Sequence, residues 1–115
     1  MIEQEVAPLN LLALKNGDPF EQTRMVETYS NGIYGLALRM LNNSHDAEDV
    51  LQETFIKAIH AIGNFEGRSS LATWLYRIAA NRCKDLRRWR RLRAFIGLED
   101  LHDLLPADEI DAEAA

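Results

Sequence analysis

The chain has 115 residues, of which 47% are hydrophobic and 27% charged, with a formal net charge of -5. This length accommodates one domain with a modest core, and the composition is that of a soluble globular protein. The single cysteine, Cys83, excludes an internal disulfide framework and a multi-cysteine metal site. No apolar run reaches the ~20 residues of a membrane span, and the acidic N-terminus does not resemble a signal peptide. We therefore expect a cytoplasmic protein without membrane insertion.

The first half of the chain is typical of two helices. Asp18 is placed to cap a helix over residues 19–41, and Glu21 follows three residues later, as in a capping box. Gly17 can end a short leucine-rich helix before it. The pair Asn31-Gly32 is a possible weak point within the longer helix.

The second half predicts two more helices separated by a loop. The polar run "NNS" at 42–44 breaks the chain, and Ser44 can cap a helix over residues 45–62. The stretch "GNFEGRSS" at 63–70 reads as a loop whose Ser69 or Ser70 caps a long helix from residue 71 to the early nineties. No segment alternates convincingly with a period of two. We therefore expect an all-α fold, a compact bundle of about four helices within residues 1–95.

The end of the chain has a different composition. Residues 96–115 are acidic, and Pro106 lies among them. This composition favours an interdomain linker or a disordered tail. The alternative is a docked amphipathic helix that would use four leucines: Leu98, Leu101, Leu104 and Leu105.

Charge is distributed unevenly along the chain. Residues 64–93 hold nine of the 13 Lys and Arg residues but two of the 18 acids. The net charge is thus -5 in residues 1–63, +7 in residues 64–93 and -7 in residues 94–115. Because a polyanion meets the local charge rather than the average, the central segment is a candidate nucleic-acid-binding surface.

The predicted helix over residues 45–62 has two faces. Six apolar residues form a stripe that we expect in the core: Ala47, Leu51, Phe55, Ala58, Ile59 and Ile62. On the opposite side lie Asp46, Asp49 and Glu53, with Gln52 and Ile56 beside them. Such an acidic face is often merely solvated, whereas an outward isoleucine among carboxylates favours docking of a basic protein partner. No metal site is expected there, since no nearby His or Cys completes a ligand set.

The helix that begins at residue 71 separates an apolar side from a basic side. The basic side is a row of five residues, here termed the basic rail: Arg77, Asn81, Lys84, Arg88 and Arg91. A solvated helix face is the alternative, but no acid interrupts the row, so its charges repel one another until an anion arrives. Phosphate contacts along the row would supply affinity for a nucleic acid.

Aromatic side chains lie where this helix begins. Trp74 falls at the seam between the basic rail and the apolar side, where it either packs in the core or stacks on a base. Phe65 either packs back on the core or forms a wall for an unstacked base. Arg82 falls among apolar residues and is expected to pair with Asp85 or to extend its stem outward.

The stretch "DAEDVLQETFIKAIHAIGNFEGRSSLATWLYRIAANRCKDLRR" resembles the promoter-reading domain, region 2, of extracytoplasmic-function (ECF) sigma factors, which are small alternative subunits of bacterial RNA polymerase. The likeness extends from about residue 14 to residue 93. It rests on the linked patterns D-A-E-D-x-x-Q-E-x-F and F-x-G-x-S-x-x-x-T-W-L-Y-R-I-A-x-N. Two linked patterns of this length are far more specific than a single short motif.

The resemblance implies two sets of contacts. In that family the D-A-E-D helix docks on the clamp helices of the polymerase beta-prime subunit, which assigns core-polymerase binding to Asp46, Asp49, Gln52, Glu53 and Ile56. The loop and the next helix bind the non-template strand of the promoter -10 element, and one base enters a pocket. This assigns DNA binding to Asn64, Phe65, Arg68, Ser69, Ser70, Trp74, Arg77, Asn81, Lys84, Arg87, Arg88 and Arg91.

The family pattern also bears on what this chain lacks. The family normally has a second, helix-turn-helix domain that reads the -35 element, and this chain stops at residue 115 without it. We therefore expect no -35 recognition and take residues 96–115 as the start of the interdomain linker. Anti-sigma proteins commonly cover these faces, so an anti-sigma factor is a further partner that the resemblance allows.

Two other functions compete with promoter recognition. One is a sigma-like helical protein-interaction module that does not melt DNA. The other is a metal-dependent nuclease built on Asp46, Asp49 and Glu53, which lacks ligands from a second element. We expect no enzymatic activity and no cofactor.

Overall fold

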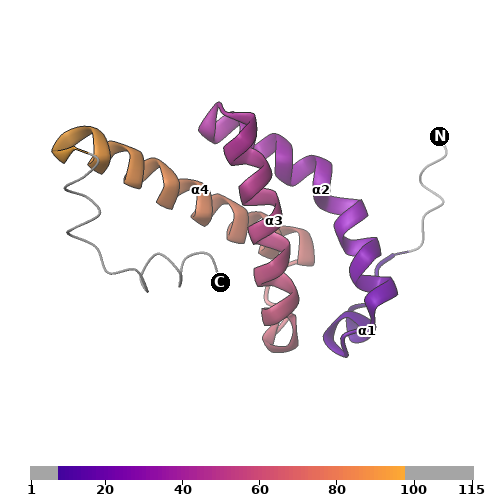
Figure 1. Cartoon of the computed structure of the whole chain (residues 1–115). Helices are drawn as coiled ribbons and strands as arrows, with labels where there is room; N and C mark the ends of the chain where they lie inside the picture. Colours follow the sequence, from indigo (N-terminus) through magenta and orange to yellow (C-terminus); the bar gives the residue numbers. More distant parts are fainter. Residues whose placement is uncertain (1–7, 98–115) are drawn as a thin grey trace.

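The structure, a computed structural model, describes residues 8–97, and these residues fold into helices joined by short connections (Figure 1). The elements are α1 (Leu11–Lys15), α2 (Pro19–Leu41), α3 (Ser44–Ala61), the 3-10 helix η2 (Ile62–Asn64) and α4 (Leu71–Ile96). Helices α2, α3 and α4 pack against one another, and α1 packs against α2 and η2. The predicted all-α bundle is confirmed. The acidic tail, and with it the choice between linker and docked helix, lies outside the described residues.

Helix α2 begins as the sequence predicts, but without the capping box. The Asp18 carboxylate accepts a hydrogen bond from a backbone N–H in the first turn of α2, at 3.0 Å. The Asp18 backbone N–H already donates to the carbonyl of Ala13 in α1, at 3.0 Å. Because that donor is occupied, the Glu21 carboxylate instead accepts a hydrogen bond from the backbone N–H of Asn10, at 2.6 Å.

The caps of α3 and α4 fit the polar runs in the sequence. Asn43, and not Ser44 as predicted, is the N-cap of α3, and its side-chain oxygen accepts a hydrogen bond from the N–H of Asp46 at 2.9 Å. Ser70, one of the two expected candidates, caps α4, and its hydroxyl accepts a hydrogen bond from the N–H of Thr73 at 3.0 Å. Each cap satisfies one of the backbone donors that a helix start leaves without a partner.

The core is lined by all three long helices. Of the predicted α3 stripe, Leu51 and Ile59 are partly buried and the other four residues are buried. Val50 and Thr54 are buried as well, although neither belongs to the predicted stripe. The reason is that α2 and α4 both pack on α3, so a wider arc of α3 is covered than one neighbour would cover.

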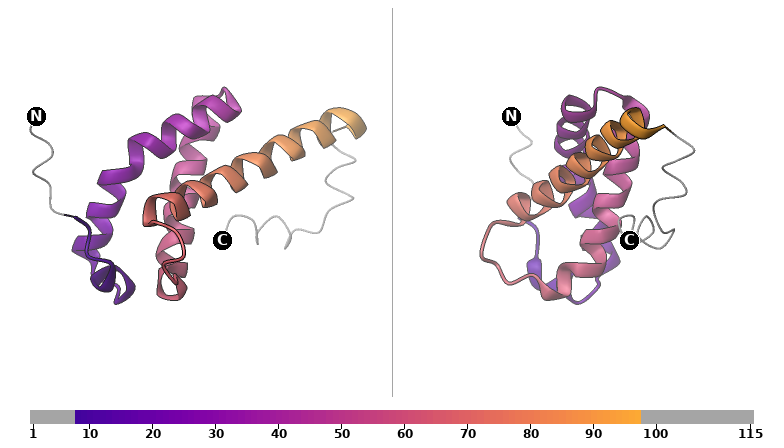
Figure 2. Two further views of the ribbon diagram at one scale, coloured as in Figure 1. Left: turned by 180° about the vertical axis from the view of Figure 1, so that it is seen from behind. Right: turned by 90° about the vertical axis from the view of Figure 1, so that its left-hand side faces the viewer.

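Helix α4 extends beyond its partners. Its buried residues are Leu75, Ala79 and Cys83, all in the first half of the helix. The last turns project past α2 and α3 (Figure 1, Figure 2).

Burial raises the pKa of the Cys83 thiol, so the thiol stays protonated near neutral pH and is no nucleophile. Within residues 8–97, no helix combines the length and the apolar composition that crossing a membrane requires.

Candidate nucleic-acid interface

The basic rail lies on the solvent side of α4. All five of its members are exposed: Arg77, Asn81, Lys84, Arg88 and Arg91. Three or four residues separate successive members, so the row follows one line for ~20 Å of helix. Arg87, beside the row, is exposed too. The Arg88 guanidinium pairs with the Asp85 carboxylate at 2.7 Å.

Two other arginines of α4 serve the fold. Arg82 Nε donates to Glu53 Oε1 of α3 at 2.5 Å, and both side chains are largely covered. Arg90 forms an ion pair with Asp46 at the start of α3 and also donates to the carbonyl of Leu41 at 3.3 Å. These contacts join α4 to α3 at two positions along the helices. The positive charge of residues 64–93 thus divides into an outward set and a set that holds the bundle together.

The acidic face of α3 is only partly open to a partner. Asp49 and Gln52 are exposed, and 48% of the surface of Ile56 is accessible. Asp46 and Glu53 lie on the same side of the helix, but each is engaged by an arginine of α4. The five residues assigned to polymerase binding therefore share a side of α3, and three of them are open to solvent.

Phe65 occupies the first of its two predicted alternatives and packs on the core. Only 7% of its surface is exposed. Its ring faces that of Trp74, with the centroids 5.0 Å apart and the planes tilted by 51°. Trp74 is half-buried, as its position at the seam predicts. The Phe65 ring therefore packs on the core and against the Trp74 ring, and it is not exposed as a wall for a base.

The polar side chains of the loop differ in how far they are already engaged within the fold. Asn64 is exposed, and the exposed Arg68 side chain pairs with Glu66 at 2.9 Å. The Ser69 hydroxyl donates to the carbonyl of Ser70 at 3.2 Å. The Ser70 hydroxyl caps α4 and is therefore engaged within the fold. Asn64 and Arg68 are the loop side chains most open to a ligand.

A hollow of about 640 Å³ lies on the side of the loop that faces α1. It is lined by Leu11, Lys15, Gly63, Asn64, Phe65, Glu66 and Gly67. Its size is that of pockets that hold small ligands. The family resemblance implied a base pocket at the loop, but it did not point to Leu11 and Lys15. No spacing or motif marks these two residues, because only the packing of α1 beside η2 brings them to the loop.

No group of carboxylate, His and Cys side chains within residues 8–97 is arranged to hold a metal ion. The neutral, buried Cys83 thiol supplies no nucleophile. The described surface offers an exposed cationic row on α4, a hollow between the loop and α1, and an acidic patch on α3. These features suit the binding of charged partners.

Comparisons with known proteins identify relatives of this chain. A family model described as Sigma-70 region 2 matches residues 25–94. The RNA polymerase sigma-H factor of Pseudomonas aeruginosa is 41% identical over 85 residues, which are 74% of this chain and 44% of that protein. The ECF RNA polymerase sigma factor SigW of Bacillus subtilis is 46% identical over 68 residues, 59% of this chain and 36% of that protein. The chain thus spans less than half the length of these relatives.

A solved structure shares the fold. The NMR structure of an engineered region 2 of sigmaE in complex with GTAAAA matches with a TM-score of 0.65 and 35% identity, covering 80% of this chain and 98% of that one. Sigma factors are transcription initiation factors and not enzymes. Together, the family match over residues 25–94 and the shared fold show that the chain belongs to the ECF sigma factors as a sigma-70 region 2 domain.

Proposed function

We propose that this chain binds core RNA polymerase through α3 and recognises and opens the promoter -10 element through its loop and α4, as a step in transcription initiation. The observation that supports this most directly is the exposed basic rail, which runs along the helix that the loop precedes. In this proposal, the strand lies along the rail and places one base in the hollow beside the loop. The site of action would be the cytoplasm, where polymerase meets promoters.

Strand opening on such a surface has to be driven by binding. Unstacking costs about a few kcal/mol per base step, and the sequence has no loop of the kind that binds ATP phosphates. The chain must therefore bind the separated strand more tightly than the duplex. The arginines contact phosphates, which both forms present, and supply affinity with little preference. The preference comes from the loop and its hollow, which accept a base only after it has left the stack.

The polymerase-binding surface is centred on the open part of the acidic face. Asp49 and Gln52 offer polar contacts, and Ile56 adds an apolar one. A basic partner such as the beta-prime clamp helices fits this combination. Asp46 and Glu53 add to the negative electrostatic potential of this face while they remain paired with arginines of α4. An anti-sigma factor that covered either surface would block one of the two interactions.

Fluorescence anisotropy with labelled oligonucleotides tests the DNA half of the proposal. The probes are the six-nucleotide strand GTAAAA, its variants changed at one position at a time, and the corresponding duplexes. We expect single strands to bind more tightly than duplexes and a preference at one or more positions. Asn81→Ala should abolish that preference, whereas Asn31→Ala, an equal change on the exposed side of α2, should not. Equal binding of every strand and duplex would leave only a protein-interaction module.

Association with core polymerase tests the other half. Asp49→Lys reverses a charge on the open part of α3 and should weaken binding to core polymerase by at least tenfold. The matched control is Glu27→Lys, which reverses an exposed charge on α2. Oligonucleotide binding should be unchanged in Asp49→Lys. Loss of both activities together would show that the two surfaces are not separate.

A further inference from the structure

One hydrogen bond fastens the loop to the opposite wall of the hollow. Lys15 Nζ, at the end of α1, donates to the carbonyl oxygen of Phe65 at 2.7 Å. The Phe65 ring is held in the core against Trp74, so its carbonyl marks the point where the backbone leaves the core for the exposed loop. The Lys15 ammonium therefore fixes the backbone at the start of the segment that forms the hollow.

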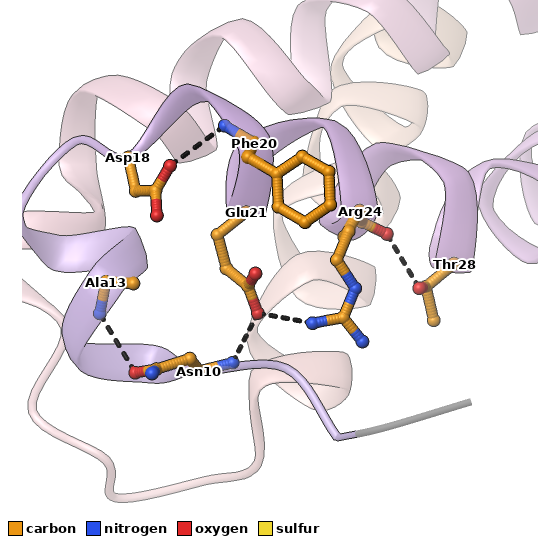
Figure 3. A network of polar contacts seen from close by, with 7 residues as sticks. All are labelled: Asn10, Ala13, Asp18, Phe20, Glu21, Arg24 and Thr28. Carbon is orange, nitrogen blue, oxygen red and sulfur yellow. Dashed lines mark hydrogen bonds and ion pairs between the residues drawn. The ribbon is translucent and has the colours of Figure 1, made fainter. Parts of the chain in front are cut away.

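The position of Lys15 is itself determined by a buried carboxylate. Helix α1 has five residues, too few to be stable alone. The Glu21 carboxylate of α2, 5% exposed, accepts hydrogen bonds from the backbone N–H of Asn10 at 2.6 Å and from Arg24 at 2.7 Å (Figure 3). Asn10 in turn caps α1. A continuous set of contacts thus runs from the core of α2 through α1 to the loop.

The rest of the loop is held less firmly. Gly63 and Gly67 are exposed, and Gly67 has a φ of 77°, which glycine adopts without strain. The ion pair of Glu66 with Arg68 is open to solvent, and such pairs contribute little. The contact of Lys15 with the Phe65 carbonyl, which is partly shielded, therefore does more to set the width of the hollow than the contacts at the loop tip.

We propose that Lys15 is a positioning residue that determines base preference in strand recognition. The inference deepens the proposed function and rests on it. An ammonium group has three donors, and one of them is committed to the Phe65 carbonyl. By holding the loop at a fixed distance from α1, Lys15 keeps the hollow shaped for one extruded base. Without that bond the loop adapts to different bases, and discrimination falls more than affinity.

The test uses the full chain and three variants. Lys15→Met keeps most of the apolar stem and removes the donor, Lys15→Arg keeps charge and donors, and Lys57→Met removes an equal charge from an exposed position on α3. With GTAAAA and its single-position variants, we expect Lys15→Met to lower base discrimination about five- to tenfold, the effect of losing one ordinary hydrogen bond, because this contact is only partly shielded from solvent. Lys15→Arg should stay within about twofold of the wild type.

Two outcomes would overturn the inference. One is that Lys15→Met and Lys57→Met weaken all strands equally, since Lys15 would then act only as a charge. The other is seen without DNA: amide hydrogen exchange in residues 65–70 should be faster in Lys15→Met than in Lys57→Met, and equal rates would refute a positioning role. If the wild type shows no base preference, the proposed function fails, and the exchange experiment still decides whether Lys15 positions the loop.

Discussion

Gly32 shows how a single residue permits two helices to approach. The sequence marked it as a possible weak point of α2, but the helix runs through it without a break. A Cβ atom at Gly32 would overlap the Tyr76 hydroxyl oxygen of α4 and lie 3.1 Å from Tyr76 Cζ. The glycine therefore makes room for a side chain of the neighbouring helix, and the loss of helix propensity is the cost of that packing.

Gly32→Ala should destabilise the protein although alanine favours helices. Displacing the Tyr76 side chain costs about 1–3 kcal/mol, against a gain of about 1 kcal/mol from helix propensity, so we expect a net loss of up to about 2 kcal/mol. Gly35→Ala is the matched control, because its Cβ would meet only Arg39 Nη1 at an ordinary 3.5 Å. That variant should be neutral or more stable. Urea unfolding of both variants measures the difference, and an equal gain in both would show that Tyr76 does not constrain Gly32.

At the scale of elements, local sequence signals predict where the helices lie but not which side chains make contact between helices. Helix α2 has the predicted bounds, and α3 begins one residue earlier than predicted because Asn43 makes the capping bond. Caps and hydrophobic periodicity are local, so a sequence reveals them. The engagement of Asp46 and Glu53 by α4 depends on the crossing of two helices, which no local pattern encodes.

Local sequence patterns likewise predict some features of the candidate site and not others. The outward side of α4 was predictable, because a helical wheel separates Arg77 and Lys84 from the apolar residues. The choice between the two alternatives for Phe65 needed the fold, since the same aromatic residue suits a core and a base pocket. Lys15 could not be identified at all, because 50 residues separate it from the carbonyl that it contacts.

The ion pair between α3 and α4 gives a prediction at this scale. Glu53→Ala removes the carboxylate that accepts from Arg82 in a largely covered position. Hydrogen bonds to charged groups contribute about 1.5–3 kcal/mol. Partial exposure of both side chains lowers this contribution, so we expect a loss of about 1–2 kcal/mol in the free energy of unfolding. Asp49→Ala, one turn earlier on the exposed surface, should change it by less than about 0.5 kcal/mol. Thermal and urea unfolding check both values, and equal effects would contradict the distinction drawn between the two carboxylates.

For the whole molecule, the decisive property is the separation of charge. The chain has a net charge of -5, yet the exposed side of α4 is positive and the open part of α3 is negative. Such a molecule should have little general attraction for a polyanion and should bind one where the cationic row is presented. Under the proposed function, the same separation would let a basic protein surface contact α3 while a DNA strand contacts α4.

Salt dependence measures whether the cationic row acts as the DNA-binding surface. For single strands, log K falls with log salt concentration by about 0.7 per contacted phosphate, so Lys84→Ala should reduce the slope by about that amount. Arg39→Ala, which removes an exposed charge from α2, should leave the slope unchanged. The measurement is anisotropy of a labelled strand over a salt series. If both variants lower the slope equally, binding reflects the overall charge of the molecule, and the surface on α4 has no particular part in it.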